Sequence, residues 1–579
     1  MLTFRQINIK YRLFFCLQTL AFTLILNAKN VSPWNYNWPK YEVRAVWLTT
    51  LSGLDWPKTY ATNELSIKKQ KAEMIKILDK LKDANINTVL FQTRIRSTVI
   101  YPSSIEPWDA CMSGTFNKFP GYDPLAFVVE ECHKRGMELH AWIVSIPAGK
   151  WNSNGCKILR RKHPSLIVRK GQEGFLDPAN PATAIYLSSI CSEITQRYDI
   201  DGIHLDYIRY PETWQASKQT ENQYIKNKQK KHITNIVKTI HDNVKRLKPW
   251  VKLSCATIGK YSDLIRQTSN GWNAFDKGCQ DVHEWMRNGL VDQIYPMMYF
   301  RGNNFYPFLF DWAENCYGCT IIPGLGIYFL SPDEGEWPLE DIKRQMNVSR
   351  SIGMGYAIFR ENFFTKNVKG IYDYTKELFT PIPSLIHPIK NTAPQPNTPV
   401  NLSITESKNK ITLTWDCKNN TEERNTFNIY ASSTHPVNID NAQNILAVRL
   451  SNTTITLDKN RNNLHFAVTS VNRYGIESAP IQCKHNDASQ KLIQSQFNLL
   501  ENNGKTLKLP SKVSVLDAEY VLLKNLIGTV ISTYPYKTSI DIRNIPSGHY
   551  AIYSLDSKGR THKLGFTFIS HKNSNVIPY

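Results

Sequence analysis

Several common catalytic signatures are missing from this sequence of 579 residues. It has no G-x-S-x-G nucleophile elbow, no glycine-rich phosphate loop and no H-E-x-x-H pair of metal ligands. The glycines of "GLGIYF" lack the spacing of a dinucleotide-binding loop. These absences argue against the α/β-hydrolase, phosphate-loop nucleotidase, metalloprotease and dinucleotide-dependent classes that carry those motifs, and we expect no cofactor.

Long apolar runs are scarce as well, and the one clear example lies at the amino terminus. Arg5, Lys10 and Arg12 precede "LFFCLQTLAFTLIL", and Asn27-Ala28 follows it. This order of charge, apolar run and small residue predicts a signal peptide over residues 1–28. A membrane anchor is the alternative, but the run is shorter than the ~20 residues that span a bilayer. We therefore expect an exported protein of the periplasm or cell surface, with no stable membrane span after cleavage.

Acidic residues are in short supply: 49 Asp and Glu face 70 Lys and Arg, which gives a net charge of +21. Such an excess indicates an anionic partner or surface. Nucleic acid fits poorly, because the chain is predicted to be exported and contains no nucleic-acid-binding motif. A polyanionic glycan or a cell envelope fits better.

Cysteine is too rare for a disulfide scaffold: eleven are present, and ten remain after removal of the signal peptide. Cys132, Cys191 and Cys255 lie in apolar patterns, where cysteine packs as a small hydrophobe. The pairings Cys111–Cys156 and Cys417–Cys483 stay open. "CYGC" at 316–319 has zinc-like spacing, but no second pair accompanies it, so we predict no metal site.

Between residues 43 and 375, short β-rich runs alternate with helical periodicity. This alternation is typical of parallel strands joined by crossover helices. Eight runs qualify: "VRAVWLTT", "INTVLFQTR", "MELHAWIVSI", "IDGIHLDY", "VKLSCATI", "VDQIYPMMYF", "TIIPGLGIY" and "GYAIFREN". They predict an α/β fold, a (β/α)8 TIM barrel over residues 29–385, with a doubly wound open sheet as the alternative.

The helices between these runs are expected from apolar spacing and capping residues. Met74, Ile77, Leu78 and Leu81 form one stripe, and a second stripe runs from 233 to 247. Asn180 is expected to cap a further helix, with Pro181 at its first position.

Past the barrel, the composition changes twice. A proline-rich stretch over 386–397 predicts a linker. Short alternating strands over 398–486 predict a small β-sandwich, and Trp415, Tyr430 and "AVTSVNRYGIESAP" resemble a fibronectin type III module. Residues 492–579 predict a second small all-β sandwich domain. No repeat of fixed period is found, and we expect a monomer.

Three aspartates lie in "RYDIDGIHLDYIRYP", around a run that is predicted to be the fourth strand. Asp206 falls at the carboxyl end of that strand, where TIM barrels build their active sites. Asp201 lies at the strand's start and is expected to be structural. The alternative for Asp206 is a loop cap or an ion pair with Arg209.

Other strand ends also carry polar or aromatic residues. Together they place two carboxylates, aromatic rings and arginines at one mouth. This set matches glycoside hydrolysis, because that reaction uses two carboxyl groups for catalysis and aromatic platforms for the sugar rings. We predict Asp206 and Glu361 as the catalytic pair, with Glu334 and Glu336 in reserve. His140 has a competing interpretation as a core residue. The predicted substrate-binding residues are Arg94, Trp108, His140, Trp142, Tyr207, Arg209, Tyr299 and Arg301.

These residues bring the chain close to a known family. From about Glu42 to Tyr374 it resembles the glycosyl hydrolase-like 10 proteins, on the stretches "EVRAVWLTT", "PGYDPL", "HKRGMELHAW", "FLDPANP" and "DGIHLDY". The resemblance implies an exported or lipid-anchored (β/α)8 glycosidase, some relatives of which cleave peptidoglycan glycan strands. It places Asp206, Tyr207 and Arg209 in the site, and Arg94, His140 and Trp142 in the cleft.

The chain departs from the family pattern at three places on the mouth side. Thr98 lies near an expected aspartate, "VSIP" at 144–147 replaces an Asn-Pro-Tyr, and Met297 replaces a glutamine. The leading hypothesis is hydrolysis of an envelope polysaccharide, with peptidoglycan strands as the best guess. A non-catalytic glycan receptor on an inactivated barrel, and a glycosidase of host or dietary glycans, are the alternatives.

Overall fold

A computed structural model describes residues 38–214, 222–389, 393–407, 409–417, 425–458, 464–482, 500, 502–510, 518–525, 530–557 and 561–569. The chain divides into two compact units between Cys483 and Lys484. The predicted signal peptide and Cys483 lie outside the described residues. No helix in the described part of the chain is both long and apolar enough to cross a membrane.

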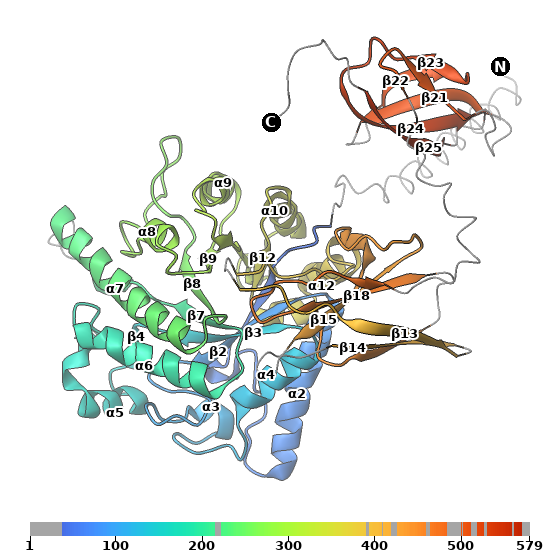
Figure 1. The fold of residues 1–579 in the computed structure, drawn as a ribbon. Coiled ribbons are helices and arrows are strands. Elements are labelled where there is room, and N and C mark those ends of the chain that lie inside the picture. Colours follow the sequence, from blue (N-terminus) through green and yellow to red (C-terminus); the bar gives the residue numbers. More distant parts are fainter. Residues whose placement is uncertain are drawn as a thin grey trace, which may run out of the picture. The chain divides into compact units, whose positions relative to one another are not determined.

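The first unit is built on a closed barrel of eight parallel strands (Figure 1). Its strand order is β9-β11-β12-β1-β2-β3-β7-β8, and a parallel β8–β9 pairing closes the ring. All eight predicted runs form barrel strands, so the open-sheet alternative is wrong. The strands are β1 Arg44–Leu48, β2 Thr88–Arg94, β3 Glu138–Val144, β7 Gly202–Asp206, β8 Lys252–Ile258, β9 Gln293–Met297, β10 Thr320–Ile321 with β11 Gly324–Gly326, and β12 Tyr356–Phe359.

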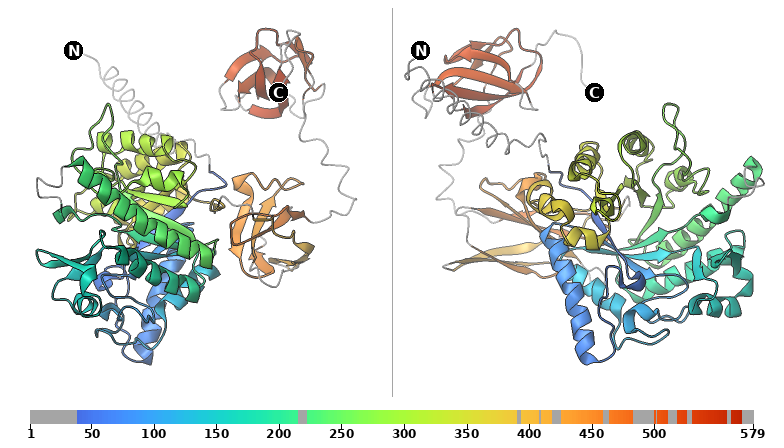
Figure 2. Two further views of the ribbon diagram at one scale, coloured as in Figure 1. Left: turned by 60° about the vertical axis from the view of Figure 1, so that its left-hand side comes forward. Right: turned by 180° about the vertical axis from the view of Figure 1, so that it is seen from behind.

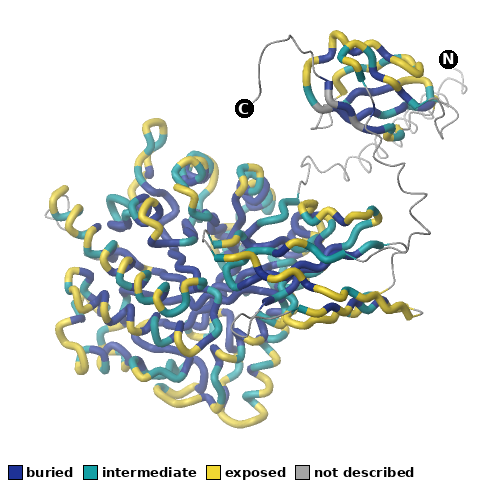
Figure 3. The backbone as a smooth tube through the Cα atoms, viewed as in Figure 1, coloured by how far each residue is buried: buried dark blue, intermediate teal, exposed yellow. Residues whose placement is uncertain are grey.

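Helices follow each strand and cover the outside of the barrel. Asn63 and Ser66 form a capping box at the start of α2, and Asn180 caps α6 with Pro181 at its first position, as predicted. The helices of the barrel unit are α2 Glu64–Asp83, α3 Ala110–Ser113, α4 Pro124–Lys134, α5 Asn154–Lys162, α6 Pro181–Arg197, α7 Gln223–Leu247, α8 Val282–Arg287, α9 Tyr306–Glu314, α10 Leu339–Ser351, α11 Glu361–Thr365 and α12 Ile371–Asp373. Figure 3 shows the buried strands inside and the exposed faces of the helices outside.

The barrel interior is packed with side chains, several of them polar. The indole N–H of Trp47 donates to Nε2 of His204 at 3.1 Å, and Nδ1 of His204 lies 3.0 Å from the Ser254 hydroxyl. Burial lowers the pKa of His204 well below its ordinary value. A neutral imidazole with both nitrogens in hydrogen bonds is what an apolar interior tolerates.

A segment of about thirty residues interrupts the repeat after β3. It contains β4 Pro147–Lys150, α5, β5 Ile167–Lys170 and β6 Glu173–Leu176, and the three strands form an antiparallel sheet in the order β4-β6-β5. We call residues 147–176 the rim segment. In Figures 1 and 2 it lies on the side of the barrel away from the strands between residues 400 and 482.

Those strands form two small antiparallel sheets in the same unit. One has the order β13-β14-β17 and the other β16-β15-β18-β19. Trp415 is buried among apolar residues of both sheets. The small β domain is thus present, and its fibronectin type III resemblance stays a prediction. The strands are β13 Val400–Glu406, β14 Lys410–Asp416, β15 Thr426–Ser432, β16 Ile445–Leu450, β17 Thr454–Asp458, β18 His465–Val471 and β19 Ile481–Gln482.

Ion pairs join this β domain to the amino-terminal end of the barrel. The Arg449 guanidinium contacts Glu138 at 2.7 Å and Asp201 at 2.6 Å, and Arg473 pairs with Asp199. Asp201 also accepts a hydrogen bond from the Leu139 N–H at 2.9 Å. The structural role expected for Asp201 is therefore confirmed.

In the described residues of the second unit, the paired strands are antiparallel. β20 Thr506–Lys508 pairs with β23 Ser539–Asp541, and β22 Val530–Pro535, β21 Ala518–Asn525, β24 Gly548–Asp556 and β25 Thr561–Ile569 form the other sheet in that order. Leu507, Val521, Leu523, Ile542 and Ile552 are central to its buried apolar core.

Candidate active site

Asp206 is the last residue of β7, at the carboxyl end of the barrel strands. It keeps 5% exposure. The Trp142 indole N–H donates to its Oδ2 at 3.1 Å, and the Tyr207 N–H donates to its Oδ1 at 2.7 Å. Burial raises the pKa of Asp206, and the Arg209 charge opposes that shift. The carboxyl group is thus held in place and keeps its proton to a higher pH than an exposed aspartate.

Buried hydrogen-bond donors beside Asp206 have no protein partner. Arg209, 5% exposed, donates from Nη2 to Glu212 at 3.2 Å, but its Nε and Nη1 contact no acceptor among the described residues. The Tyr299 hydroxyl is buried without a partner in the same way. Burial, with the Asp206 carboxylate in addition, raises the pKa of Tyr299 well above its usual range, so the hydroxyl stays protonated. Since an unpaired buried donor costs about 1–3 kcal/mol, these groups are suited to ligand oxygens.

Tyr207 turns the chain sharply at this point. Its φ is 49°, in the left-handed region that bulky residues rarely adopt. The ring is 37% exposed, and the Arg209 guanidinium lies 4.3 Å from its centre. Such strain in a loop next to a polar cluster is typical of a functional site.

An aromatic wall extends across the mouth from β12 toward α10. The Phe359 and Tyr299 rings lie 5.2 Å apart, and Tyr299 meets Tyr328 at 5.8 Å. Tyr328 contacts Phe329 at 4.1 Å, and Phe329 stacks on Trp337 at 4.4 Å. Half-buried rings in a row provide the apolar platforms on which sugar rings stack.

Arg301 lies at the outer end of this wall. Its guanidinium is 5.4 Å from the Trp337 ring and pairs with Asp341 on α10. The side chain is 47% exposed. The predicted residues Tyr299 and Arg301 thus belong to one surface, whereas Tyr328, Phe329 and Trp337 were missed. Tyr328 ends the seventh predicted strand run, so the strand-end rule could have found it.

Glu361 lies in a different cluster. It is 2% exposed, and the Thr365 hydroxyl donates to its Oε1 at 2.6 Å. Burial, with the nearby Asp55 charge in addition, raises the pKa of Glu361 to about 7. Asp55 in turn pairs with Arg360. Within the described ranges, no hydrogen bond or ion pair joins Glu361 to Asp206, and its role as the second acid stays a prediction.

Glu212 is the carboxylate whose charge acts on Asp206. It raises the Asp206 pKa further, contacts Arg209 and is 49% exposed. The sequence interpretation missed it, although it follows Arg209 by three positions in the same loop. The reserves Glu334 and Glu336 are exposed residues of the loop after β11.

Two predicted substrate-binding residues do not fit the structure. Arg94 is fully buried, pairs with Glu106 at 2.7 Å and donates to the Ser145 carbonyl at 3.0 Å. His140 is fully buried beside Gly202 at the amino-terminal end of β7 and lies 3.2 Å from Glu138. Neither can reach a sugar without displacing protein atoms, and the core interpretation of His140 is correct.

The two tryptophans that were predicted to bind substrate have different surroundings. Trp142 is 5% exposed and orients Asp206 through its N–H. Trp108 is half-buried and packs edge-on against Phe119 at 5.6 Å, with no described contact to Asp206.

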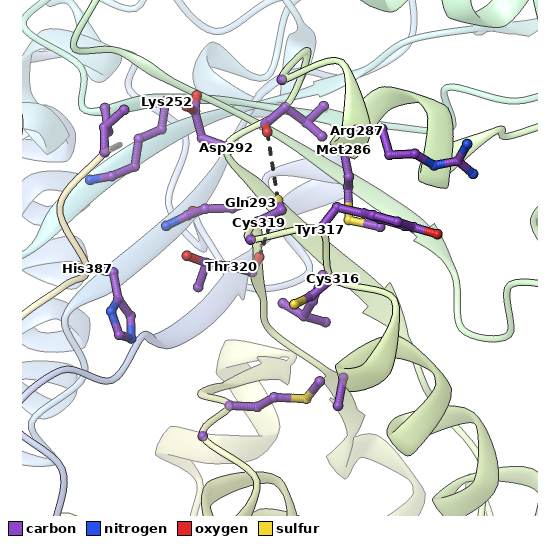
Figure 4. Close-up of a pocket in the computed structure, with 18 of the residues that line it drawn as sticks. Lys252, Met286, Arg287, Asp292, Gln293, Cys316, Tyr317, Cys319, Thr320 and His387 are labelled. Carbon is purple, nitrogen blue, oxygen red and sulfur yellow. Dashed lines mark hydrogen bonds between the residues drawn. The ribbon is translucent and has the colours of Figure 1, made fainter. Parts of the chain in front are cut away.

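A cavity of about 650 Å³ opens at the other end of the barrel (Figure 4). Lys252, Gln293 and Thr320, each the first residue of its strand, line it together with His387 and Cys319. This is the end that TIM barrels use for stability. In the described part of the chain, no three His, Cys, Asp or Glu side chains are placed to hold a metal ion.

Known proteins support the glycoside hydrolase interpretation of this chain. Glycosyl hydrolase YngK of Bacillus subtilis (strain 168) is 29% identical over 402 residues, 64% of this chain and 78% of the relative. Glycosyl hydrolase DigH of Escherichia coli (strain K12) is 27% identical over 369 residues, 56% of this chain and 84% of the relative.

Among solved structures, the PgaB (BpsB) glycoside hydrolase domain from Bordetella bronchiseptica aligns with 58% of this chain and 98% of its own. The identity is 13% and the TM-score 0.40, so the barrel assignment rests on this chain's own strand order. Residues 42–323 match the model of the family named Glycosyl hydrolase-like 10. The barrel of this chain is therefore similar to the glycosyl hydrolase-like 10 family over residues 42–323, and the chain is an enzyme of the glycoside hydrolase class.

Proposed function

We propose that this chain is an exported glycoside hydrolase that cleaves O-glycosidic bonds of a bacterial envelope polysaccharide, and that peptidoglycan glycan strands are its substrate. One observation carries the proposal: Asp206 stands at the barrel mouth beside the unpartnered donors of Arg209 and Tyr299. The predicted signal peptide and the charge of +21 favour an envelope polymer over a neutral, intracellular one.

The chemistry assigned to Asp206 follows from its raised pKa. A carboxyl group that keeps its proton can give it to the leaving glycosidic oxygen. The Trp142 indole N–H and the Tyr207 N–H donate to the two carboxyl oxygens, so the carboxyl group is held in one orientation. The Tyr299 hydroxyl and the free Arg209 nitrogens would donate to sugar oxygens.

A second carboxylate is needed to activate water or to attack the sugar. Glu361 is the residue predicted from the sequence, and Glu212 is the one whose charge acts on Asp206. Carboxyl groups about 5 Å apart in the complex would give retention, and about 6.5–9.5 Å inversion.

The decisive experiment compares Asp206→Asn with wild type on peptide-free peptidoglycan strands and on a panel of neutral and acidic polysaccharides. Release of reducing ends should fall about 10²–10⁴-fold in Asp206→Asn, because the proton donor is lost. Asp242→Asn is the matched control, since its carboxylate is half-exposed on α7 and, within the described residues, pairs with Lys238 and His241. Equal activity of Asp206→Asn and wild type would refute the assignment.

Two further arms identify the second acid. Glu212→Gln and Glu361→Gln are assayed with the same substrates, and the true partner should lose activity as steeply as Asp206→Asn. Binding of glycan strands without any product from wild type would favour the receptor alternative.

A further inference from the structure

The rim segment, residues 147–176, is strongly basic. It contains seven Lys or Arg residues and one acidic residue, Glu173, which gives this segment a formal charge of +6. The basic residues are Lys150, Lys157, Arg160, Arg161, Lys162, Arg169 and Lys170. The density exceeds that of the chain as a whole, where basic and acidic residues number 70 and 49.

These charges are free to act on a partner. Six of the seven residues are exposed, and Arg160 is half-buried. In the described part of the chain, none of the seven forms an ion pair with a carboxylate, whereas basic residues elsewhere, such as Arg135, Lys245 and Arg350, do. Unneutralised like charges held on one small segment repel each other, and an anion would relieve that repulsion.

The rim segment adjoins the loop that carries the active-site residues. Lys170 lies 5.2 Å from the Trp214 ring, and Phe175 meets the same ring at 6.0 Å. Trp214 also packs against Tyr210 at 5.5 Å, one residue after Arg209. The basic surface therefore continues into the loop of Tyr207, Arg209 and Glu212.

Aromatic rings lie between the charges. The Arg160 guanidinium lies 3.8 Å from the Trp151 ring, and Arg169 lies 5.4 Å from it. On α5, Leu159 is buried and Ile158 half-buried, so the exposed face of the helix presents charges without the apolar residues that insert into a membrane.

We propose that the exposed face of α5 and β5 binds an acidic polysaccharide beside the catalytic mouth. The bound polymer would pass from this surface onto the loop of Arg209, so that the charge of the rim segment raises the local concentration of substrate chains. The choice of a glycan over other polyanions rests on the proposed function, while the surface itself stands on the charges and contacts given above.

The test uses the full chain with Asp206→Asn, so that binding is measured without hydrolysis. Affinity for polygalacturonate and for neutral dextran is measured by calorimetry at low and at raised NaCl. K157Q/R161Q/K162Q removes three exposed charges from α5, none of which makes a described side-chain hydrogen bond. K68Q/K69Q/K76Q removes three exposed charges from α2 and is the matched control.

We expect polygalacturonate to bind far more tightly than dextran and to weaken with salt, because screening shortens the reach of exposed charges. The α5 variant should bind polygalacturonate at least about fivefold more weakly, and the α2 variant should change by less than about twofold. Equal losses in both variants, an unchanged α5 variant, or tighter binding to DNA or anionic phospholipid vesicles would overturn the proposal. Hydrolysis is scored separately, so this surface and the catalytic assignment can fail independently.

Discussion

Asp206 and Glu361 were predicted as a pair because both end barrel strands, yet their surroundings differ. Asp206 accepts a hydrogen bond from the Trp142 indole and lies beside donors that have no partner among the described residues. Glu361 accepts a hydrogen bond from the Thr365 hydroxyl and lies near the Asp55 charge instead. A residue at the end of a predicted strand can be expected at the mouth of the barrel. The residues that surround it there lie partly in loops, and the apolar pattern of the sequence does not predict the path of a loop. For that reason Glu212, which lies in a loop, was missed.

Arg94 shows a second reason why a sequence pattern does not predict every site residue. The pairing of β2 with β3 shifts between Gln92 and Arg94, so the alternation of side chains is broken there. Arg94 consequently bonds Glu106 and the Ser145 carbonyl in the packed protein, with Tyr186 of α6 nearby. One extra residue in a strand exchanges the two faces, and nothing in the composition of "FQTR" announces it.

Glu361 should make the stability of the protein depend on pH. Its folded pKa of about 7 exceeds the ordinary value of 4.5, because burial favours the neutral acid. The native state therefore binds the proton more tightly than the unfolded chain, and this stabilisation is complete below about pH 4.5 and lost as pH rises through about 7. Glu361→Gln stays neutral and should gain up to about 3 kcal/mol over wild type between pH 4.5 and 8.

The measurement is urea unfolding across that pH range. Glu314→Gln, an exposed residue of α9, is the control and should follow wild type at every pH. A constant difference between Glu361→Gln and wild type from pH 4.5 to 8 would contradict a raised pKa.

At the scale of elements, the eight strands were predicted well because buried parallel strands leave continuous apolar runs. The cap of α6 was also predictable, since Asn180 and Pro181 act within one turn. His140 was expected near the end of the run "MELHAWIVSI", whereas it is the third residue of β3, which continues to Val144. His140 pairs with Gly202, the first residue of β7, and so lies toward the opposite end of the barrel.

This pairing gives Gly202 a role in the barrel. A Cβ at this position would lie 2.6 Å from Cγ and Nδ1 of the fully buried His140 ring. Gly202→Ala should therefore cost about 1–3 kcal/mol, because the ring must leave its place in a packed interior. In a His140→Ala background the same change should cost much less, as the obstructing ring is gone. Denaturant unfolding of the four proteins gives the coupling, and an equal cost in both backgrounds would disprove the contact.

At the scale of the whole barrel unit, the two ends have separate tasks. The carboxyl ends carry Asp206 and the aromatic wall, and the amino-terminal end is covered by the β domain through Arg449 and Arg473. The three aspartates of "RYDIDGIHLDYIRYP" are divided between these tasks. The sequence predicted both domains from their different periodicities, but the ion pairs that join them link residues 248 or more positions apart and leave no local pattern.

Arg449 provides the test of this division. Burial would raise the pKa of Glu138, but Lys252 and Arg449 outweigh it and lower that pKa to about 2. Burial would likewise raise the pKa of Asp201, and Arg449 and His133 hold it well below its ordinary value. Because these pKa values are lowered, the stabilisation is complete above about pH 4.5 and lost as pH falls toward 2.

Arg449→Gln removes one partner of a buried ion pair, which typically costs about 3–5 kcal/mol. We expect a loss of about that size at pH 7 that shrinks as pH falls below 4, where the carboxylates left without Arg449 take up protons. Thermal or urea unfolding of the full chain at pH 3 and pH 7 measures it, and Arg266→Gln, an exposed arginine without a described partner, is the control.

Glycan release by folded Arg449→Gln should match wild type, since Asp206 lies at the other end of β7. A loss that is equal at both pH values, or a catalytic defect in the folded variant, would show that the amino-terminal end does more than hold the two domains together.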